Sequence, residues 1–387
     1  MPTFKVKTYN KIAKIGLNRF SDKYQISDDI KNPDAIILRS FDLHSETIPE
    51  SVLAVGRAGA GVNNVPVEEL TERGIVVFNA PGGNANSVKE LVLSALFLAA
   101  RNIPEALEYA DNLTAGNMKD QVEAGKKQFA GTEIAGKTLG VIGLGAIGHK
   151  VANSGIDLGM RVYGYDPAMT INNAWQLSPA VQRVEDIKQL VKNCDYISIH
   201  VPLIPQTKGL IDAEKIVAMK PGAVLINFSR DQIVEETALL KALNDGKLAR
   251  YVTDFPNETV AGNPKVTALP HLGASTLEAE DNCAVMVADQ IQDYLENGNI
   301  INAVNFPNAQ LPRAGGARIV LAHKNEPGMV AEITAVLAKA KINISELLNN
   351  HKDDYAYTII DIDQPTLDET TIKKLESINN LLKLRII

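Results

Sequence analysis

Short apolar runs alternate with longer amphipathic stretches along most of the chain, a pattern typical of alternating β-strands and α-helices. Near the N-terminus the pattern predicts strands at Ala35–Leu38, Leu53–Val55 and Ile75–Phe78. Between the last two it predicts a helix over Val67–Arg73, which Gly74 ends. We therefore expect a small α/β domain in this part of the chain.

A second series of runs predicts the parallel sheet of a larger domain. Its first strand is Thr138–Ile142, and each later strand leads into a loop at the carboxyl edge of the sheet, where open parallel sheets bind ligands. The fold class is α/β with a doubly wound parallel sheet. The later elements are strands at Tyr196–His200, Ala223–Phe228, Tyr251–Phe255 and Val266–Leu269 and a helix at Ala238–Asn244.

Two long helical patterns are expected to lie near the boundaries of these domains. Ser87–Arg101 is apolar almost all round, which is typical of a helix buried between domains. The helix predicted at Leu277–Glu296 is expected to return the chain to the first domain. The parallel-sheet domain, residues 93–283, would thus be inserted in a smaller α/β domain formed by residues 1–92 and 284–305.

The remaining residues predict a linker and a third domain. Residues 306–316 (FPNAQLPRAGG) hold two Pro and two Gly without periodicity, which indicates a linker. Residues 317–387 show the order βαββαβ, which predicts a ferredoxin-like α+β sandwich with its helices on one face. The expected elements are strands at Arg318–Ala322, Asn343–Leu348, Tyr355–Ile362 and Leu382–Ile386, with helices opening near Gly328 and over Leu367–Ile378.

The loop after the first strand of the larger sheet carries the strongest chemical signal. Gly143, Gly145 and Gly148 form a GxGxxG pattern before a predicted helix, and Asp166 ends the next apolar run. Such glycines permit a tight turn, close approach of the backbone to a pyrophosphate and close helix packing, while the helix N-terminus offers N–H groups. Asp166 would accept hydrogen bonds from the adenosine ribose and repel a 2′-phosphate. The pattern predicts a dinucleotide site that prefers NAD to NADP.

Charge and composition restrict the partners of the chain. A formal net charge of −7 argues against broad binding to nucleic acid or to an anionic membrane. Met1–Arg19 shows neither the apolar core nor the cleavage site of a signal peptide. We expect Cys194 and Cys283 to be buried, reduced thiols, and we identify no metal site. These features predict a cytoplasmic protein that acts on a small molecule.

Three residues that follow strands of the larger sheet suit the oxidation of an alcohol. Arg230, Glu258 and His271 are expected at one sheet edge, beside the glycine-rich loop. Histidine accepts a hydroxyl proton near neutral pH, a neighbouring carboxylate fixes its tautomer, and arginine holds a substrate carboxylate. His200, followed by Pro202, is expected to line the cofactor rather than to take part in catalysis.

These residues resemble those of a known family, the D-isomer-specific 2-hydroxyacid dehydrogenases, over nearly the whole chain. Within the family, the chain is similar to the members that oxidise D-3-phosphoglycerate, the first step of serine synthesis. The segments that carry the resemblance are Gly56–Val65, Asn79–Pro81, Gly143–Gly148 with Asp166, His200–Leu203, Asn227–Arg230 and Pro270–Thr276.

The resemblance implies a role for each group of residues. His271 would accept the proton, Glu258 would orient it, and Arg230 would complete the catalytic trio. In the other domain, the backbone N–H groups of Gly59, Ala60 and Gly61 would hold the substrate carboxylate, with Arg39 and Arg57 as candidates for its phosphate. Asp254 would meet the nicotinamide amide. The whole set implied for NAD is Gly143, Gly145, Ala146, Ile147, Gly148, Asp166, His200, Pro202, Phe228, Ser229, Arg230, Asp254, His271 and Gly273.

The chain departs from the family pattern in two loops of this expected site. Phe228 and Asp231 stand where the family commonly has a small residue and a glycine. The segment from Asp254 to Glu258 is one residue shorter than is usual in the family. The choice of Glu258 as orienting residue depends on how this shorter loop is built.

The C-terminal residues resemble an ACT domain, a regulatory module that binds amino acids, through residues 323–328 and 342–344. In serine-inhibited relatives, the residues matching His323, Asn325 and Asn343 contact L-serine at an interface between domains. The alternative is a dimerisation module whose Asn and His side chains only cap turns. A homo-oligomer, dimer or tetramer, is expected with either role.

Two other functions stay open from the sequence. One is another D-2-hydroxyacid dehydrogenase, acting on glycerate or lactate, because the catalytic trio would contact only the hydroxy-acid part of a substrate. The other is an NAD-sensing binding protein, similar to the corepressors built on this scaffold. Arg230, Glu258 and His271 weigh against the second function, and the two arginines and the C-terminal module favour the phosphorylated substrate.

Overall fold

The structure is a computed structural model that describes residues 3–387, so Met1 and Pro2 of the N-terminal stretch considered above lie outside the described residues. Its contacts divide the chain into two units, each described here by itself. The inserted unit is Ala85–Thr276, and the enclosing unit holds the residues up to Asn84 together with Leu277–Ile387. The parallel-sheet domain is therefore inserted in the other one, as the sequence predicts.

The division between the units does not fall where the sequence analysis placed the domain boundaries. The units meet at residues 84/85 and 276/277, ahead of the expected 92/93 and 283/284. The reason is that α3 (Ala85–Ala100) and α11 (Leu277–Asn297) are unbroken helices that begin at these points, and an unbroken helix packs as one body.

The inserted unit is built on a seven-stranded sheet in which every pairing is parallel. β6 and β9 are neighbours, and the chain order runs outward from them in both directions. The sheet therefore has its topological switch point between β6 and β9, where open α/β sheets bind ligands. Its order is β12 (Val266–Ala268), β11 (Leu248–Thr253), β10 (Ala223–Asn227), β9 (Tyr196–Ile199), β6 (Thr138–Ile142), β7 (Arg161–Tyr165) and β8 (Gln182–Arg183).

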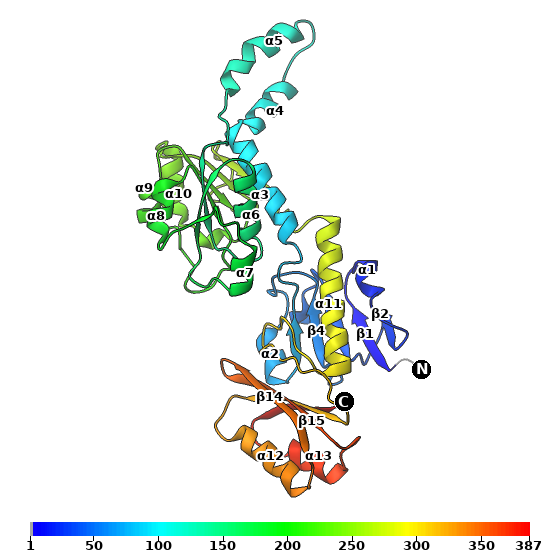
Figure 1. The fold of residues 1–387 in the computed structure, drawn as a ribbon. Helices are drawn as coiled ribbons and strands as arrows, with labels where there is room; N and C mark the ends of the chain where they lie inside the picture. Colours follow the sequence, from blue (N-terminus) through cyan, green and yellow to red (C-terminus); the bar gives the residue numbers. More distant parts are fainter. Residues whose placement is uncertain (1–2) are drawn as a thin grey trace. The chain divides into compact units, whose positions relative to one another are not determined.

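Helices cover both faces of this sheet, as Figure 1 shows. On one face α3 and α6 (Gly148–Asp157) pack onto it, and on the other lie α8 (Ile187–Asn193), α9 (Ala213–Ala218) and α10 (Glu236–Asn244). The central strands β6, β9 and β10 are buried along their whole length, as strands covered on both faces require. The doubly wound arrangement predicted from the sequence is confirmed.

A helical hairpin of the inserted unit was not predicted. α4 (Ile103–Asp111) and α5 (Met118–Gly125) extend from the end of α3 in Figure 1, and α4 has no buried residue. The apolar residues of α4 do recur at helical spacing, so the sequence pattern could have predicted this helix. The short helix α7 (Ile171–Gln176), after Asp166, was also not predicted, and none of its residues is buried.

The enclosing unit begins with a five-stranded parallel sheet of its own. α11 packs so closely on this sheet that a Cβ at Gly56 would meet the side chains of Val287 and Ile291. α1 (Lys14–Leu17) contacts α11. The 3₁₀ turn Leu43–Ser45 lies in the connection from β3 to β4, and α2 (Val67–Glu72) in the connection from β4 to β5. The sheet order is β2 (Tyr24–Ser27), β1 (Phe4–Thr8), β3 (Ala35–Leu38), β4 (Ala54–Arg57) and β5 (Val76–Phe78).

The last residues form the predicted βαββαβ domain, with its four strands antiparallel in the order β14-β15-β13-β16. Helices α12 and α13 share a core with one face of this sheet, and the other face shares a core with α11. The segment expected as a linker is packed, because Phe306 is fully buried and Ala309 pairs with Ile300. The elements are β13 (Arg318–Lys324), α12 (Met329–Lys339), β14 (Ile344–Lys352), β15 (Tyr355–Ile362), α13 (Glu369–Glu376) and β16 (Leu381–Ile386).

Cys194 and Cys283 are both buried and form no disulfide, as expected. Among residues 3–387, the helices are all too short or too polar to cross a membrane.

Candidate active site

The glycine-rich loop lies at the switch point, between β6 and α6. Gly143 has φ +86°, and its N–H donates to Tyr165 O at 2.8 Å. A Cβ at Gly148 would overlap the carbonyl oxygen of Gly143, so only glycine fits there. At Gly145, by contrast, a Cβ would meet open space. The loop is thus tight where helix meets strand and open where a pyrophosphate needs bare backbone.

Asp166, at the end of β7, is bound to this loop. Its Oδ2 accepts the N–H of Leu144 at 2.7 Å, and its Oδ1 accepts that of Ala168 at 2.8 Å. Each carboxylate oxygen has about two acceptor sites, so each keeps capacity for a ribose hydroxyl. The geometry fits the expected role of Asp166 and adds a second one, which is to hold the glycine-rich turn.

Asp254 supplies an unsatisfied acceptor after β11. The residue is 1% exposed, its Oδ2 accepts the N–H of Gly273 at 2.9 Å, and its Oδ1 is buried without a partner. Burial raises the pKa of Asp254, and the Gly273 N–H and the charges of His271 and Arg230 offset this only in part. A buried carboxylate oxygen without a donor is costly, which fits an amide N–H such as that of nicotinamide.

Arg230 follows β10, on a loop that a buried amide holds in place. Asn227 Nδ2 donates to the carbonyl of Arg230 at 2.8 Å and to the hydroxyl of Tyr251 at 3.2 Å, and its Oδ1 accepts the N–H of Ser229. Asn227 is fully buried. Neither Asn227 nor Tyr251 was predicted as a site residue. Their hydrogen bond joins the side chains of two neighbouring strands, which a sequence pattern does not show.

Phe255 brings Arg230 and His271 together. The Arg230 guanidinium lies over its ring, 5.0 Å from the centroid, and the His271 ring lies 4.4 Å from it, centroid to centroid. Both contacts are attractive, the first as a cation–π pair. The two predicted catalytic side chains therefore share one aromatic neighbour, beside the buried Asp254. Phe255 was not predicted as a site residue, although it stands next to Asp254 in the sequence.

Glu258 lies in an exposed turn instead. In the part of the chain that the structure describes, no hydrogen bond or ion pair joins it to His271. The preceding Asn257 donates to Glu236, and its Oδ1 accepts two backbone N–H groups of the same turn, which holds that turn on α10. His271 affects Asp254 only through its charge, which tends to lower the pKa of that carboxyl, and no hydrogen bond or ion pair joins the two side chains in the described residues.

His200, directly after β9, and Ser229, after β10, lie in neighbouring loops at the same edge of the sheet. His200 Nε2 lies 2.8 Å from Ser198 Oγ, and burial lowers the pKa of His200 to about 3. Its imidazole is thus neutral near pH 7, which agrees with a lining role. Ser229 Oγ donates to the carbonyl of Ile199 at 2.9 Å, and the neighbouring Phe228 is buried. Pro202 follows in the same loop as His200.

The residues expected to hold the substrate lie in the enclosing unit, after β3 and β4. Arg57 Nε donates to the carbonyl of Arg39 at 3.0 Å, and a Cβ at Gly59 would overlap the Arg57 guanidinium. The N–H of Gly59 donates to Arg57 O at 2.7 Å, which leaves the carboxylate role to Ala60 and Gly61. The two arginines and the glycine-rich turn form one cationic edge of this sheet.

Comparison with known proteins assigns this geometry to a family. Residues 93–273 match the model of the D-isomer specific 2-hydroxyacid dehydrogenase, NAD binding domain. D-3-phosphoglycerate dehydrogenase of Escherichia coli K12 is 34% identical over 382 residues, which cover 95% of this chain and 90% of that relative. The chain belongs to the D-isomer-specific 2-hydroxyacid dehydrogenases.

Other family members agree with this assignment. D-3-phosphoglycerate dehydrogenase of Methanocaldococcus jannaschii is 36% identical over 319 residues, which cover 80% of this chain and 59% of that longer relative. A solved 3-phosphoglycerate dehydrogenase of Entamoeba histolytica with bound NAD⁺ has a TM-score of 0.60 and 26% identity, covering 78% of this chain and 99% of that one. D-mandelate dehydrogenase of Rhodotorula graminis, with a TM-score of 0.68, 22% identity and 80% and 99% coverage, shares the fold. The inserted unit of this dehydrogenase binds NAD.

The three residues proposed to bind an effector do not meet within one chain of this dehydrogenase. His323 is 1% exposed, and its ring nitrogens lie 2.8 Å from Lys324 O and 2.9 Å from Thr358 Oγ1. Asn325 follows at the same end of β13, where Nδ2 donates to Asp353 O. Asn343 lies at the opposite end of the sheet and donates to Asp363.

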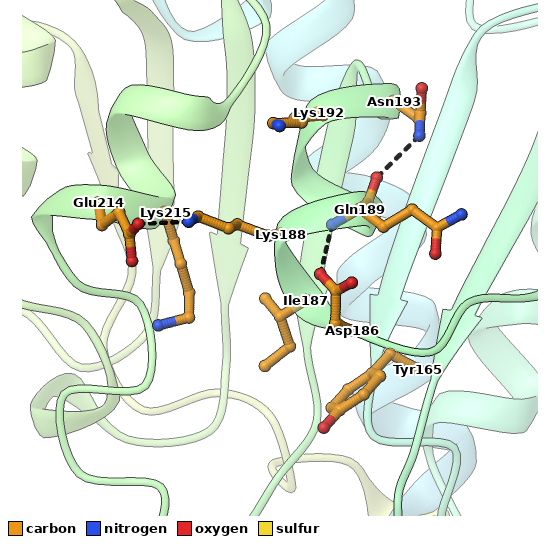
Figure 2. A pocket seen from close by; sticks show the side chains of 9 residues that line it. All are labelled: Tyr165, Asp186, Ile187, Lys188, Gln189, Lys192, Asn193, Glu214 and Lys215. Carbon is orange, nitrogen blue, oxygen red and sulfur yellow. Dashed lines mark hydrogen bonds and ion pairs between the residues drawn. The ribbon is translucent and has the colours of Figure 1, made fainter.

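A cavity of this dehydrogenase is separate from the site. It measures about 610 Å³ and lies between α8 and α9 (Figure 2). Its charged groups are largely paired within the chain, because Lys188 pairs with Glu214, Lys215 pairs with Asp212, and Asp186 caps α8 by accepting the N–H of Gln189. None of the proposed site residues lines it, and we assign it no role.

Proposed function

We propose that this dehydrogenase oxidises D-3-phosphoglycerate to 3-phosphohydroxypyruvate with NAD, the first step of L-serine synthesis. The observation that carries the proposal is the grouping of Arg230, His271 and Asp254 around Phe255, on the sheet edge that also holds the glycine-rich loop. The names of relatives that are 34% and 36% identical support the choice of substrate.

Each group has one task in the proposed reaction. His271 accepts the proton of the C2 hydroxyl, and Arg230 binds the substrate carboxylate and polarises the oxygen on C2. Bound NAD accepts the hydride from C2. The unpartnered oxygen of Asp254 receives the nicotinamide amide, and Asp166 receives the adenosine ribose.

The proposed role of His271 also calls for a carboxylate that holds its imidazole in one tautomer. We propose Glu258, on the resemblance to the family, and Asp254 as the alternative, because the charge of His271 tends to lower the pKa of Asp254. A bound substrate or cofactor can rearrange a loop of this length. Replacing Glu258 by Gln tests the first assignment, because it removes the charge and keeps the size of the side chain. A pH–rate profile that does not move would leave Asp254 as the partner.

The substrate is also held from the enclosing unit. We propose that the N–H groups of Ala60 and Gly61 bind its carboxylate, and that Arg39 and Arg57 bind its phosphate. We propose three domains: a substrate-binding domain of residues 1–84 and 277–305, an NAD-binding domain of residues 85–276 and a C-terminal domain of residues 317–387. We further propose that the enzyme is cytoplasmic.

The C-terminal domain is proposed to be an ACT domain that binds L-serine. Because His323 and Asn325 lie at the opposite end of the sheet from Asn343, one chain does not offer all three to a ligand. β14 is an edge strand with mostly exposed side chains. Antiparallel pairing of this edge in two copies would bring Asn343 of one copy to His323 and Asn325 of the other.

We propose a homo-oligomer on a second, independent ground. The α4–α5 hairpin exposes Leu107 (58%), Met118 (50%) and Val122 (45%), although apolar side chains of this size are usually covered. A second copy is the proposed cover. The molar mass in solution, measured by light scattering for the protein and for Leu107→Lys, tests this directly. An unchanged dimer or tetramer in the variant would exclude this contact.

The proposed reaction is tested by the formation of NADH with three substrates. D-3-phosphoglycerate is expected to give a much higher kcat/KM than D-glycerate or D-lactate. A preference for D-glycerate or D-lactate would indicate the other hydroxyacid dehydrogenases. No turnover with any of them, despite NAD binding, would indicate the sensor function that the sequence left open.

A further inference from the structure

An ion pair occupies the cationic edge of the enclosing unit. Arg39, after β3, places Nη1 2.6 Å from Oε1 of Glu280, in the first turn of α11. The two side chains are 32% and 38% exposed, so the pair borders on solvent. Arg39 is one of the two residues proposed to bind the substrate phosphate, and in this structure a carboxylate of the chain itself holds it.

The surroundings of this pair carry two cations. Arg57 donates to the carbonyl of Arg39 at 3.0 Å. Burial raises the pKa of the Cys283 thiol on α11, and the charges of Arg57 and Arg39 lower it, so both guanidiniums act on the same turns of the helix. The anion that the structure pairs with Arg39 is Glu280.

We propose that Glu280 lowers the affinity for the phosphate of the substrate, and with it the preference for phosphorylated over unphosphorylated substrates, by competing with the phosphate for Arg39. This inference rests on the proposed function, which gives Arg39 the phosphate. A phosphate monoester carries about −1.5 to −2 charges near pH 7 and three acceptor oxygens, whereas the Glu280 carboxylate carries one charge. The dianion can displace the carboxylate, and a monoanion gains little by doing so.

The competition has two consequences for binding. Breaking the pair reduces the free energy that the phosphate gains at Arg39, and the released carboxylate repels the phosphate, so Glu280 raises KM for a phosphorylated substrate. D-glycerate has no group that reaches for Arg39, so its KM does not depend on Glu280. The alternative is that Glu280 only stabilises the helix N-terminus, as acidic residues in a first turn do.

Glu280→Gln separates these two roles, because glutamine keeps the shape and loses the charge. The proposal predicts that KM for D-3-phosphoglycerate falls by about 1.4- to fivefold, the range set by the free energy of exposed ion pairs. The change is expected in KM and not in kcat. Inorganic phosphate, as a competitive inhibitor, is expected to show a parallel fall in its inhibition constant, while KM for D-glycerate stays unchanged.

Two controls complete the experiment. Glu278→Gln removes an acid from the same first turn of α11, where the structure shows no ion pair among its described residues, and is expected to leave KM unchanged. In an Arg39→Gln background, Glu280→Gln is expected to have no further effect on KM. A constant or raised KM in Glu280→Gln, or an effect that persists without Arg39, overturns the proposal.

The proposed function can fail separately. If the unmodified enzyme forms no NADH from D-3-phosphoglycerate, the substrate assignment is wrong. Inorganic phosphate binding, measured by calorimetry, then still tests the competition. Tighter binding to Glu280→Gln than to the unmodified protein supports it, and equal or weaker binding rejects it.

Discussion

At the scale of single residues, the site depends on side chains that meet only through the fold. Gly143, Gly148 and Asp166 could be predicted because their roles are local to one βαβ unit. The contact of Phe255 with Arg230 and His271 could not be, since it joins three loops. Glu258 illustrates the same limit, because a short loop decides where its carboxylate lies and the sequence does not determine that loop.

Replacing His271 by Ala is expected to lower kcat by about 10²- to 10⁴-fold, because no other base accepts the hydroxyl proton. The affinity for NAD, measured by the fluorescence of Trp175 on α7, is expected to change little. Asn172→Ala, at an exposed position of the same helix, is the control for effects on the Trp175 probe itself. A variant that loses NAD affinity but keeps kcat would show that the role of His271 is misassigned.

Replacing Asp166 by Ala is expected to weaken NAD binding by about tenfold or more, the effect of losing hydrogen bonds to a charged group. Discrimination against NADP should relax, since the carboxylate that repels the 2′-phosphate is gone. The ratio of kcat/KM for the two cofactors measures this. Part of the loss will come from the loop itself, because Asp166 also binds the N–H of Leu144. An unchanged ratio would contradict the assignment.

At the scale of elements, the hydrophobic pattern predicted the buried ones best. β3, β6 and β15 have the expected bounds, and α11 differs by one residue. β1 and β2, at one side of the first sheet, and the exposed α4 and α5 were not predicted. The end of α11 shows what a local pattern misses, since Arg385 of the C-terminal domain donates to the carbonyls of Tyr294 and Leu295, and Tyr357 donates to that of Gly298, just after the helix.

Arg318 of β13 and Asp361 of β15 form a buried ion pair in that domain. Both residues are 0% exposed, and Arg318 also donates to the carbonyls of Asn297 and Pro312. Arg318→Met is expected to reduce the free energy of unfolding by about 3–5 kcal/mol, because it leaves a buried carboxylate unpaired. Urea denaturation measures the effect. The double variant with Asp361→Leu should recover most of it, and equal losses in both variants would contradict this reading.

The same pair predicts a pH dependence of stability. Burial tends to raise the pKa of Asp361, but the hydrogen bonds from Arg318 and the Ala314 N–H together hold it below its ordinary value. The stabilisation is therefore full above the unfolded pKa of about 4 and is lost as pH falls through the lower folded value. The stability difference between the protein and Arg318→Met should shrink below about pH 4. A difference that grows on acidification would contradict the sign.

At the scale of the whole molecule, the proposed serine site would need residues from more than one copy of the chain. The sequence predicted three effector residues but not that the fold separates them, because strand order decides which ends of a sheet are near. Serine can inhibit only if it binds unequally to active and inactive arrangements of the subunits.

Serine at millimolar concentration is therefore expected to lower the rate of NADH formation, at a site distant from NAD. Asn343→Ala should abolish inhibition and keep the uninhibited rate. Asn379→Ala, exposed in the same domain, should behave like the unmodified protein. Unchanged turnover across millimolar serine, or full inhibition of Asn343→Ala, would leave the C-terminal domain as a dimerisation module.

In the proposed reaction, Arg230 and His271 act on one substrate carbon beside the nicotinamide ring. A crystal structure of the His271→Asn enzyme with NAD and D-3-phosphoglycerate tests it most directly. We predict that residue 271 lies within hydrogen-bond distance of the C2 hydroxyl and that the Arg230 guanidinium contacts the substrate carboxylate. Substrate bound away from both side chains, or the two side chains in separate pockets, would contradict the account.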